Sequence, residues 1–380
     1  MNRKLALVLL ATAAACGDNL DAPPDAGSNA PGADAAPQPP RAVIVAGNFV
    51  AGNPGVMSAI DLATKTVTMN VAPQGAIGED PVLRHKGDEL FVVNRASGNN
   101  VTILSASDYS LVEQLGTGPS TNPQDVVAIG EKLFVATLGN KGGVILTRGS
   151  NVITEIDLSA DDPDGKPNCS SVFYAGSKLY FACGLLDDTN QFLPPRGPGK
   201  VYLVNPSTGT VDGSITLTTK NPIALFEQIP LGAPNGGDLL LPTIDFGTGM
   251  GCIERIVTAG TPASAGCMVD NAVLGGFAFA SRVAFQGNHA RVAVSDYPQG
   301  NVRDYDLAAG ALDTAAMTAM AQVISDVTIC PGGEMVVADN PPPPSTAPNG
   351  VRIYLDAAEK TTDALPIGLR PASSHGLVCY

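Results

Sequence analysis

The sequence contains no tryptophan, only three histidines, and so few aromatic residues that they make up 5% of its 380 residues. Basic residues are also scarce, because 22 Lys and Arg stand against 36 Asp and Glu and give a formal net charge of -14. A chain this acidic repels phosphate backbones, and no basic cluster offsets that charge locally. We therefore expect no nucleic-acid partner.

Sequence motifs that carry chemistry are also missing. After residue 40 we find no G-x-S-x-G elbow, Walker loop, CxxC pair, HExxH helix or EF-hand loop. We expect His85 and His289 to lie in or beside turns on one side of the fold and His375 to open the C-terminal strand near the other side, so they should not form a metal site. These absences favour a binding or scaffold protein over an enzyme.

The N-terminus contains the one apolar run that could direct the chain to a membrane. Basic Asn2-Arg3-Lys4 precedes apolar Leu5 to Ala15, a run too short to span a bilayer, so residues 1–15 are predicted to be a signal peptide. The run ends in Ala13-Ala14-Ala15-Cys16, which resembles the lipobox of bacterial lipoproteins. That resemblance implies cleavage before Cys16 and acylation of its thiol. Ala13 replaces the larger aliphatic residue usual in that family, so cleavage at an A-x-A site and release as a soluble protein remains the alternative.

Residues 16–40 are rich in Asp, Ala, Pro, Gly and Ser and have almost no large apolar residue after Leu20. Such a segment cannot bury a core, so we expect a disordered tether behind the lipidated cysteine. The predicted location is the cell envelope, at the outer membrane or cell surface, with the membrane bound through the lipid anchor and the protein monomeric. The sequence leaves the membrane leaflet that carries the anchor undecided.

The 42 glycines and 31 prolines favour short strands joined by turns. From Arg41 one pattern returns every forty to fifty residues: an apolar strand, a tight Gly turn, a second strand, a loop, a third strand, a turn and a fourth strand. The clearest copy runs over residues 81–118, and the next begins at Asn122. A repeat of this kind predicts the four-stranded blades of a β-propeller.

Two segments of the repeat resemble the YVTN family of bacterial β-propellers: Asn100-Val101-Thr102-Ile103-Leu104 and Gly130-Glu131-Lys132-Leu133-Phe134-Val135. The prediction is an all-β fold with a single propeller over residues 41–380. Seven four-stranded blades fit best, with six or eight as alternatives, and the blade within residues 221–270 is inferred partly from spacing. Val43–Ala46 looks like a second strand without a first, and His375–Tyr380 like a first strand without a second, so the C-terminal strand should close the ring.

Seven cysteines become six once Cys16 carries the lipid, an even number that suits disulfides in an oxidising compartment. Two pairs flank hairpins, where antiparallel pairing brings their members opposite each other. The third pair is left mainly by elimination, and it would staple the ring closure. The predicted disulfides are Cys169–Cys183, Cys252–Cys267 and Cys330–Cys379.

Polar residues end several second strands, where they are expected to line the mouth of the central channel: Asn94, Asp245, Asp296 and Asp339, with Asp125 and Asp326 at the starts of inner strands nearby. Such carboxylates and amides could hold Ca²⁺ or an activated water, as the mouths of related propeller lactonases do. The alternative is that these side chains satisfy turn backbone groups, because Thr137, Cys183 and Thr243 interrupt the ring. Beyond Ca²⁺ no cofactor is expected.

Three predicted long loops follow second strands and should share one face: Leu185–Gly199, Asp245–Gly251 and the proline-rich Asn340–Gly350. Rigid loops gathered on one face can bind a partner with little ordering cost. The leading functional hypothesis is therefore an envelope lipoprotein that binds a protein, peptide or glycan, or that serves as a scaffold. The alternative is a metal-dependent lactonase or hydrolase at the channel mouth.

Overall fold

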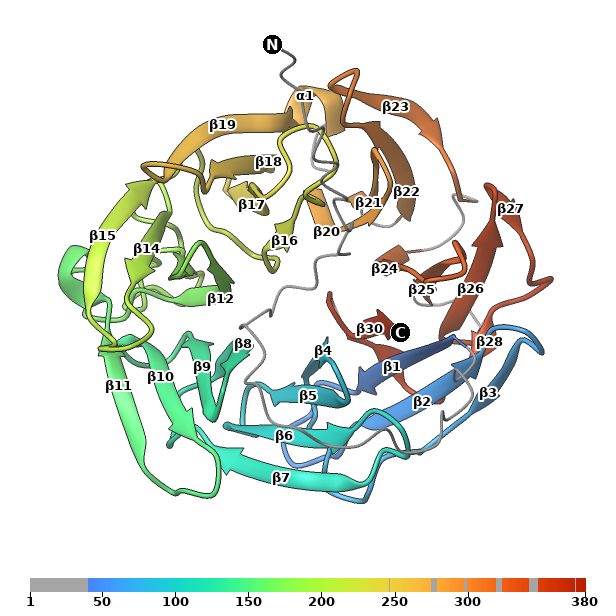
Figure 1. The fold of residues 1–380 in the computed structure, drawn as a ribbon, viewed down its shortest axis with the longest axis horizontal. Helices are drawn as coiled ribbons and strands as arrows, with labels where there is room; N and C mark the ends of the chain where they lie inside the picture. Colours follow the sequence, from blue (N-terminus) through green and yellow to red (C-terminus); the bar gives the residue numbers. More distant parts are fainter. Residues whose placement is uncertain are drawn as a thin grey trace, which may run out of the picture.

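The computed structural model describes residues 40–245, 247–274, 279–296, 299–318, 323–341, 348–372 and 374–380, without the side chains of residues 279, 296, 299 and 323. The predicted signal peptide, Cys16 and all of the tether but Pro40 lie outside the described residues, and so do residues 342–347 of the proline-rich loop. The described chain forms a ring of seven antiparallel sheets around a central axis (Figure 1), which confirms the predicted single propeller.

The first four blades follow the chain from Arg41. Blade 1 contains β1 (Arg41–Gly47), β2 (Val56–Asp61) and β3 (Thr66–Thr68), together with two C-terminal strands. Blade 2 contains β4 (Pro81–Lys86), β5 (Glu89–Asn94), β6 (Asn100–Ser105) and β7 (Leu111–Gly116). Blade 3 contains β8 (Pro123–Ile129), β9 (Lys132–Thr137), β10 (Gly142–Thr147) and β11 (Ile153–Asp157). Blade 4 contains β12 (Cys169–Ala175), β13 (Lys178–Cys183), β14 (Lys200–Val204) and β15 (Val211–Thr216).

The remaining blades include the degenerate stretch of the repeat. Blade 5 contains β16 (Glu227–Gln228), β17 (Leu239–Asp245), β18 (Met250–Val257) and β19 (Ala263–Asp270). Blade 6 contains β20 (Phe279–Gln286), β21 (His289–Asp296), β22 (Gln299–Asp306) and β23 (Ala311–Ala316). Blade 7 contains β24 (Val323–Ile329), β25 (Met335–Asn340), β26 (Gly350–Leu355), β27 (Ala358–Glu359) and β28 (Leu365–Pro366). A 3-10 turn, Ser159–Asp161, and α1 (Asn271–Leu274) complete the described elements, and none of the described helices could cross a bilayer.

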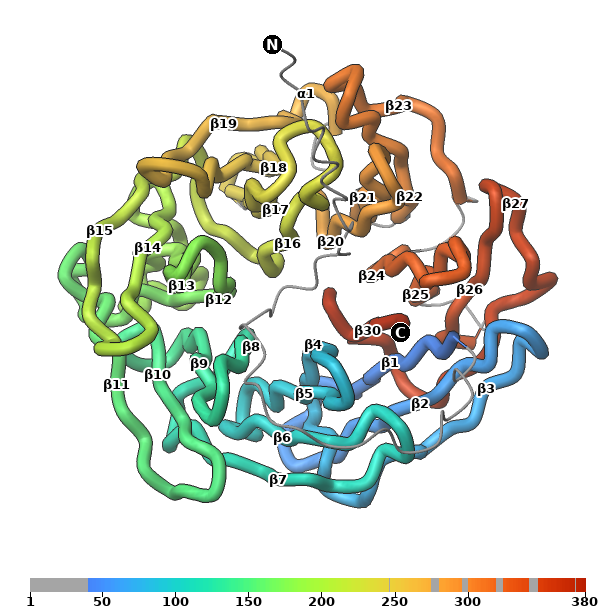
Figure 2. The backbone as a smooth tube through the Cα atoms, in the orientation of Figure 1, coloured from blue at the N-terminus to red at the C-terminus, as the bar shows by residue number. Residues whose placement is uncertain are grey.

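The ring is closed by the C-terminal strand, as predicted. The strands β29 (Arg370–Pro371) and β30 (Leu377–Cys379) both pair with β1, so the end of the chain supplies the inner strand of blade 1. Figure 2 shows the two ends of the colour scale meeting in this blade, where β30 lies beside β1. Closure leaves blade 1 without an unpaired inner edge.

The core of the described chain is divided among the blade interfaces. Seven hydrophobic clusters are present within the described residues, one between each pair of neighbouring blades. Each cluster draws on the first three strands of a blade, where apolar residues are buried on both faces of the sheet. The outer strands expose most of their side chains; β7, for example, buries only Leu115. The inner strands therefore stand on a rigid ring that can position groups at the axis.

All three predicted disulfides are present. Cys169 and Cys183 face each other across the β12–β13 hairpin, Cys252 and Cys267 join β18 to β19, and Cys330 and Cys379 join blade 7 to β30. The Cα atoms of the last pair are 5.0 Å apart, within the usual bonding range, although the two cysteines come from neighbouring blades. The disulfides indicate an oxidising, exported environment.

The two faces of the ring differ, and one loop prediction is corrected. The hairpin face carries the turns from first to second and from third to fourth strands; the loop face carries the connections from second to third strands and between blades. On the loop face residues 185–199 do form a long connection between β13 and β14. The predicted Asp245–Gly251 loop is only a tight turn, because the β17–β18 pairing continues as far as Asp245 opposite Met250.

The chain joins the ring on the hairpin face. There the backbone N–H of Arg41 donates to Tyr380 O at 2.9 Å, and its guanidinium donates to Ser107 O in the β6–β7 turn at 3.1 Å. Whatever precedes Pro40 therefore attaches on the side opposite the long loops.

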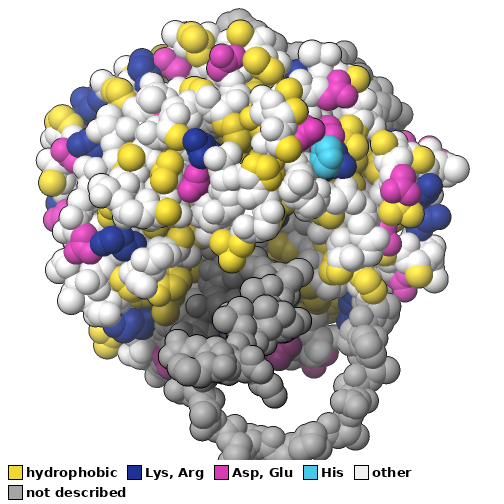
Figure 3. Space-filling view, turned by 45° about the horizontal axis from the view of Figure 1, so that its top comes forward, with side chains coloured by type: hydrophobic (Ala, Val, Ile, Leu, Met, Phe, Trp, Pro, Cys, Tyr) yellow, Lys and Arg dark blue, Asp and Glu magenta, His cyan; other side chains and the backbone are white. Residues whose placement is uncertain are grey.

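The surface shown in Figure 3 carries Lys and Arg singly among acidic and apolar side chains.

Candidate functional site in the axial channel

Four inner strands place polar side chains at one repeated position. In β8, β12, β20 and β24 a β-bulge lies near the start of the strand, and the residue after the bulge faces an alanine of the second strand. A bulge adds one residue and re-aims the side chains that follow it. The residues at this position are Asp125, Ser171, Arg282 and Asp326, opposite Ala136, Ala182, Ala293 and Ala338.

Three of these side chains join their own blade to the next one. Each accepts a hydrogen bond from a backbone N–H of the neighbouring inner strand or of the residue just before it, and the distances lie between 2.9 and 3.0 Å. The acceptor and donor pairs are Asp125 with Val172, Ser171 with Phe226, and Asp326 with Leu377. These inter-blade hydrogen bonds give the buried aspartates a structural role.

Two arginines complete the neutralisation of the aspartates. Arg84 forms a bidentate ion pair with Asp125 at 2.7 and 2.8 Å, and Nη1 of Arg282 lies 3.1 Å from Asp326 and donates to Leu377 O at 2.6 Å. Ser171 also donates to Asp125 at 2.7 Å. Both aspartate side chains are buried, with 0% and 1% exposure. Their oxygens are thus committed to the ring itself.

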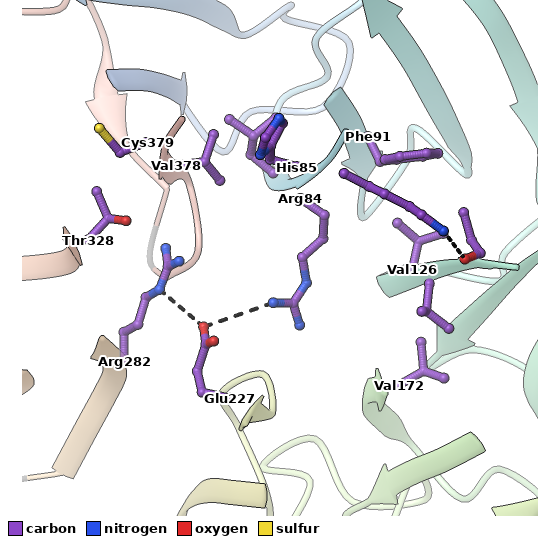
Figure 4. Close-up of a pocket in the computed structure, with 14 residues that line it drawn as sticks. Arg84, His85, Phe91, Val126, Val172, Glu227, Arg282, Thr328, Val378 and Cys379 are labelled. Carbon is purple, nitrogen blue, oxygen red and sulfur yellow. Dashed lines mark hydrogen bonds and ion pairs between the residues drawn. The ribbon is translucent and has the colours of Figure 1, made fainter. Parts of the chain in front are cut away.

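Glu227, from the short strand β16, lies between the two arginines (Figure 4). Its Oε1 is 3.4 Å from Arg282 Nε, 3.9 Å from Arg84 Nη1 and 3.3 Å from His375 Nε2. The two arginine distances are ion-pair distances, but none of the three contacts has hydrogen-bond geometry. Within the described residues Glu227 Oε1, Arg282 Nε and both His375 ring nitrogens are buried with no hydrogen-bond partner. Buried polar atoms are usually satisfied by protein, water or ligand, so such a group marks a place for a guest molecule.

His375 is fully buried beside Glu227, and its carbonyl accepts a hydrogen bond from the Leu83 N–H at 2.8 Å. Burial, and then the positive charges of Arg282 and Arg84, lower the pKa of the imidazole well below its usual range. The His375 ring is therefore neutral at neutral pH, and each of its nitrogens is either a donor or an acceptor.

Two cavities meet at this group of residues. One, of about 210 Å³, is lined by the hairpin-side halves of β4, β8 and β30; the other, of about 310 Å³, lies along β16 and β20. Glu227, Arg282 and Thr328 line both cavities. We call Arg84, Glu227, Arg282, His375 and these cavities the channel site. It lies on the hairpin side of the ring, whereas the predicted site was at the loop-face mouth.

The described residues predicted at that mouth belong to separate local networks. Asn94 fixes a turn, because its Oδ1 accepts the Gly78 N–H at 2.7 Å and its Nδ2 donates to Ala76 O at 3.1 Å. Asp245 pairs with Lys220 at 3.1 Å, which lowers the pKa of its carboxyl although partial burial opposes this. Asp339 is completely buried and pairs with Arg352 at 2.6 Å. These three residues belong to blades 2, 5 and 7.

The structure does not bring these residues together as metal ligands. Burial raises the pKa of Asp339, and its Arg352 partner occupies the side where a cation would bind. No group of three or more His, Cys, Asp or Glu side chains suited to a metal occurs within the described residues. The side chain of Asp296 lies outside the described residues, so its part in the predicted Ca²⁺ site stays a prediction. Asn94, Asp245 and Asp339 therefore do not fit a shared ion.

Of the channel-site residues, only His375 is singled out by the sequence, as the residue that opens the C-terminal strand. The sequence also places Asp125 and Asp326, the partners of the two channel arginines, near the mouth. One signal was available: Arg84, Asp125, Arg282 and Asp326 are charged residues within apolar inner strands. Glu227 offered no such signal, since β16 has two residues and lies in the least regular stretch of the repeat.

Comparison with known proteins supports the fold and leaves the activity open. No family model and no curated protein matches the chain. Two solved structures of proteins proposed to be 6-phosphogluconolactonases are similar. The Bacteroides uniformis protein is 12% identical with a TM-score of 0.60, and the match covers 90% of this chain and 100% of that one. The Bacteroides fragilis protein is 13% identical with a TM-score of 0.60, and the match covers 92% of this chain and 100% of that one. Kuenenia stuttgartiensis hydrazine synthase also matches, with 14% identity, a TM-score of 0.53 and coverage of 77% and 89%. The chain thus shares the propeller fold of these proteins.

Proposed function

We propose that the protein is an exported, lipid-anchored β-propeller that binds a small polar ligand in the channel site. The observation that carries this proposal is the meeting of two cavities at Glu227, Arg282 and Thr328, where Oε1 of Glu227 and Nε of Arg282 have no hydrogen-bond partner within the described residues. Concave sites with a few convergent polar groups are where small ligands bind. A ligand would supply the missing hydrogen bonds.

A cavity-filling variant tests this proposal. Thr328 lines both cavities, so Thr328→Phe should block them, whereas Thr64→Phe places the same ring on an exposed turn as a control. We expect native mass spectrometry of the mature protein to detect a bound small molecule that is lost from the Thr328 variant and kept by the Thr64 variant. An unliganded native protein, or a ligand retained by the blocked channel, would contradict the proposal.

A second function, binding of a protein, peptide or glycan through the loop face, is favoured by exposed apolar side chains there. Phe192 is 81% exposed and Leu193 44% in the long connection of blade 4, and Met250 is 59% exposed in the adjacent blade. Aromatic and aliphatic anchors of this kind carry much of the energy of protein interfaces. The chain joins the ring on the opposite face, so a tether ending at Pro40 leaves the loop face pointing away from the membrane.

Site-specific photocrosslinking distinguishes this second function. A photoreactive residue at Phe192 should capture a discrete envelope partner in living cells, whereas the same group at Val152, exposed on the hairpin face, should not. Equal capture at both positions, or none at Phe192, counts against a loop-face partner.

Hydrolysis of a lactone or ester is a third candidate, favoured by Glu227 and supported by the fold shared with proteins proposed to be 6-phosphogluconolactonases. A carboxylate at a cavity can accept a proton from water, and the arginines beside it can stabilise an oxyanion. D-glucono-1,5-lactone should then open faster with the native protein than with Glu227→Gln. Identical rates for the two proteins would remove this candidate.

A further inference from the structure

We infer that the ligand of the channel site is a neutral, polyhydroxylated small molecule of about monosaccharide size, and that the site rejects phosphorylated forms of it. This inference rests on the proposed ligand-binding function and names its ligand class. Three observations support it: the hydrogen-bonding groups of the described channel residues, their charges and the size of the cavities.

The unpaired hydrogen-bonding atoms of the channel site require ligand groups that both donate and accept. Glu227 and Arg282 line both cavities, where Oε1 of Glu227 needs donors and Nε of Arg282 needs an acceptor. A hydroxyl both donates and accepts, so neighbouring hydroxyls on one small ring can satisfy all these atoms together. A carboxylate or phosphate could serve Arg282 but would leave Glu227 unsatisfied and repelled.

The charges around the cavities balance without a ligand. Among the Arg, Lys, Asp and Glu side chains there, three cations, Arg84, Arg282 and Lys86, face three anions, Asp125, Asp326 and Glu227, and the buried His375 is neutral. Both arginines already have a carboxylate partner, and Lys86 donates to Ala128 O at 3.1 Å. A phosphate dianion would therefore enter a site of no net charge with Glu227 at its centre, and it would lose its hydration without gaining an unpaired cation.

The cavity size and walls agree with this ligand class. The two cavities of the channel site, of about 210 and 310 Å³, lie below and at the lower end of the range of roughly 300–1,000 Å³ typical of sites for drug-sized molecules. Val126, Val172 and Val378 also line the cavity, so the C–H groups of a sugar ring could contact apolar side chains while its hydroxyls meet Glu227.

Isothermal titration with D-glucose, myo-inositol and glucose 6-phosphate tests the inference on the mature protein. We expect at least one neutral probe to bind, and glucose 6-phosphate to bind at least tenfold more weakly than glucose. Glu227→Gln removes one negative charge, so it should weaken the neutral probe and strengthen the phosphate ester. Asp313→Asn, with the same charge change on exposed β23, should alter neither affinity.

The outcomes separate the inference from the proposed function. Tighter binding of glucose 6-phosphate than of glucose by the native protein overturns the inference and leaves a channel-binding function standing. Absence of binding by every probe also overturns the inference, and the native mass spectrum then decides whether any channel ligand exists. An unchanged preference in Glu227→Gln, with the fold confirmed by circular dichroism, shows that Glu227 does not set the selectivity.

Discussion

The carboxylate of Asp326 accepts a hydrogen bond from the backbone N–H of Leu377 at 2.9 Å and so ties blade 7 to the strand that closes the ring. The same carboxylate pairs with Arg282 at 3.1 Å, and Arg282 donates in turn to the Leu377 carbonyl at 2.6 Å. Arg282 therefore takes part in both ring closure and the channel site.

Replacement of Asp326 by alanine should destabilise the whole ring. The change leaves the buried Arg282 charge and the Leu377 N–H without their partner, and breaking a buried pair from one side costs about 3–5 kcal/mol. Urea unfolding of the mature protein measures the loss. Asp313→Ala on the exposed strand β23 should stay within about 0.5 kcal/mol of the native protein, and equal values for the two variants would refute the role of Asp326.

Loss of the closure disulfide should cost more than loss of a hairpin disulfide. The Cys330–Cys379 bond spans 49 residues and Cys252–Cys267 spans 15, so the chain-entropy relation gives about 4 and about 3 kcal/mol respectively. The comparison uses the two double serine variants in urea unfolding without reductant. A smaller loss for the Cys330 and Cys379 pair would show that the ring closes without help from the bond.

His375 should make the protein less stable in mild acid. In the unfolded chain its imidazole takes up a proton as the pH falls through ~6.5, whereas in the folded channel its pKa is well below that value. The unfolded state then binds more protons below pH ~6.5, so the free energy of unfolding falls as the pH falls, and His375 has no such effect above that pH. We expect His375→Gln to show a shallower loss between pH 7 and pH 5. Parallel curves for the two proteins would contradict a neutral, buried His375.

Asp162 should lower the free energy of unfolding at high pH, whereas His375 lowers it in mild acid. Burial, and then the neighbouring Asp164, raise the pKa of its carboxyl to about 6, and its Oδ2 has no hydrogen-bond partner within the described residues. The folded state therefore binds the extra proton between pH 6 and pH 4, so the cost of this carboxylate is present above pH 6 and is relieved as the pH falls. Asp162→Asn should stabilise the protein at pH 8 and lose that advantage near pH 4. Urea unfolding at both pH values tests this, with the exposed Asp313→Asn as control.

Cys16 decides between an anchored and a released protein. We expect metabolic labelling with an alkyne fatty acid to mark the native chain and to place it in the membrane fraction, and Cys16→Ser to abolish both. A secreted native protein that begins near residue 16 with an unlabelled thiol would establish cleavage at the A-x-A site instead.

The sequence was sufficient for most of the blades because they repeat the same apolar hairpin, and antiparallel pairing then placed Cys169 opposite Cys183. It was not sufficient for the channel site, for two physical reasons. Bulges before Ser171, Arg282 and Asp326 shift the strict alternation from which inward-facing positions are counted. In addition, Arg84, Glu227 and Arg282 come from three blades, so only the closed ring brings their charges together.

The placement of β30 in blade 1 also fixes an order of events during biogenesis. The inner strand of the first blade, β30, follows every other strand of the ring in the sequence, so β1 keeps an open edge until β30 has been synthesised. The Cys330–Cys379 bond can form only after residue 379 reaches the oxidising side of the membrane. A chain stalled or clipped before β30 would therefore present an unpaired β1 edge, which is a template for aggregation.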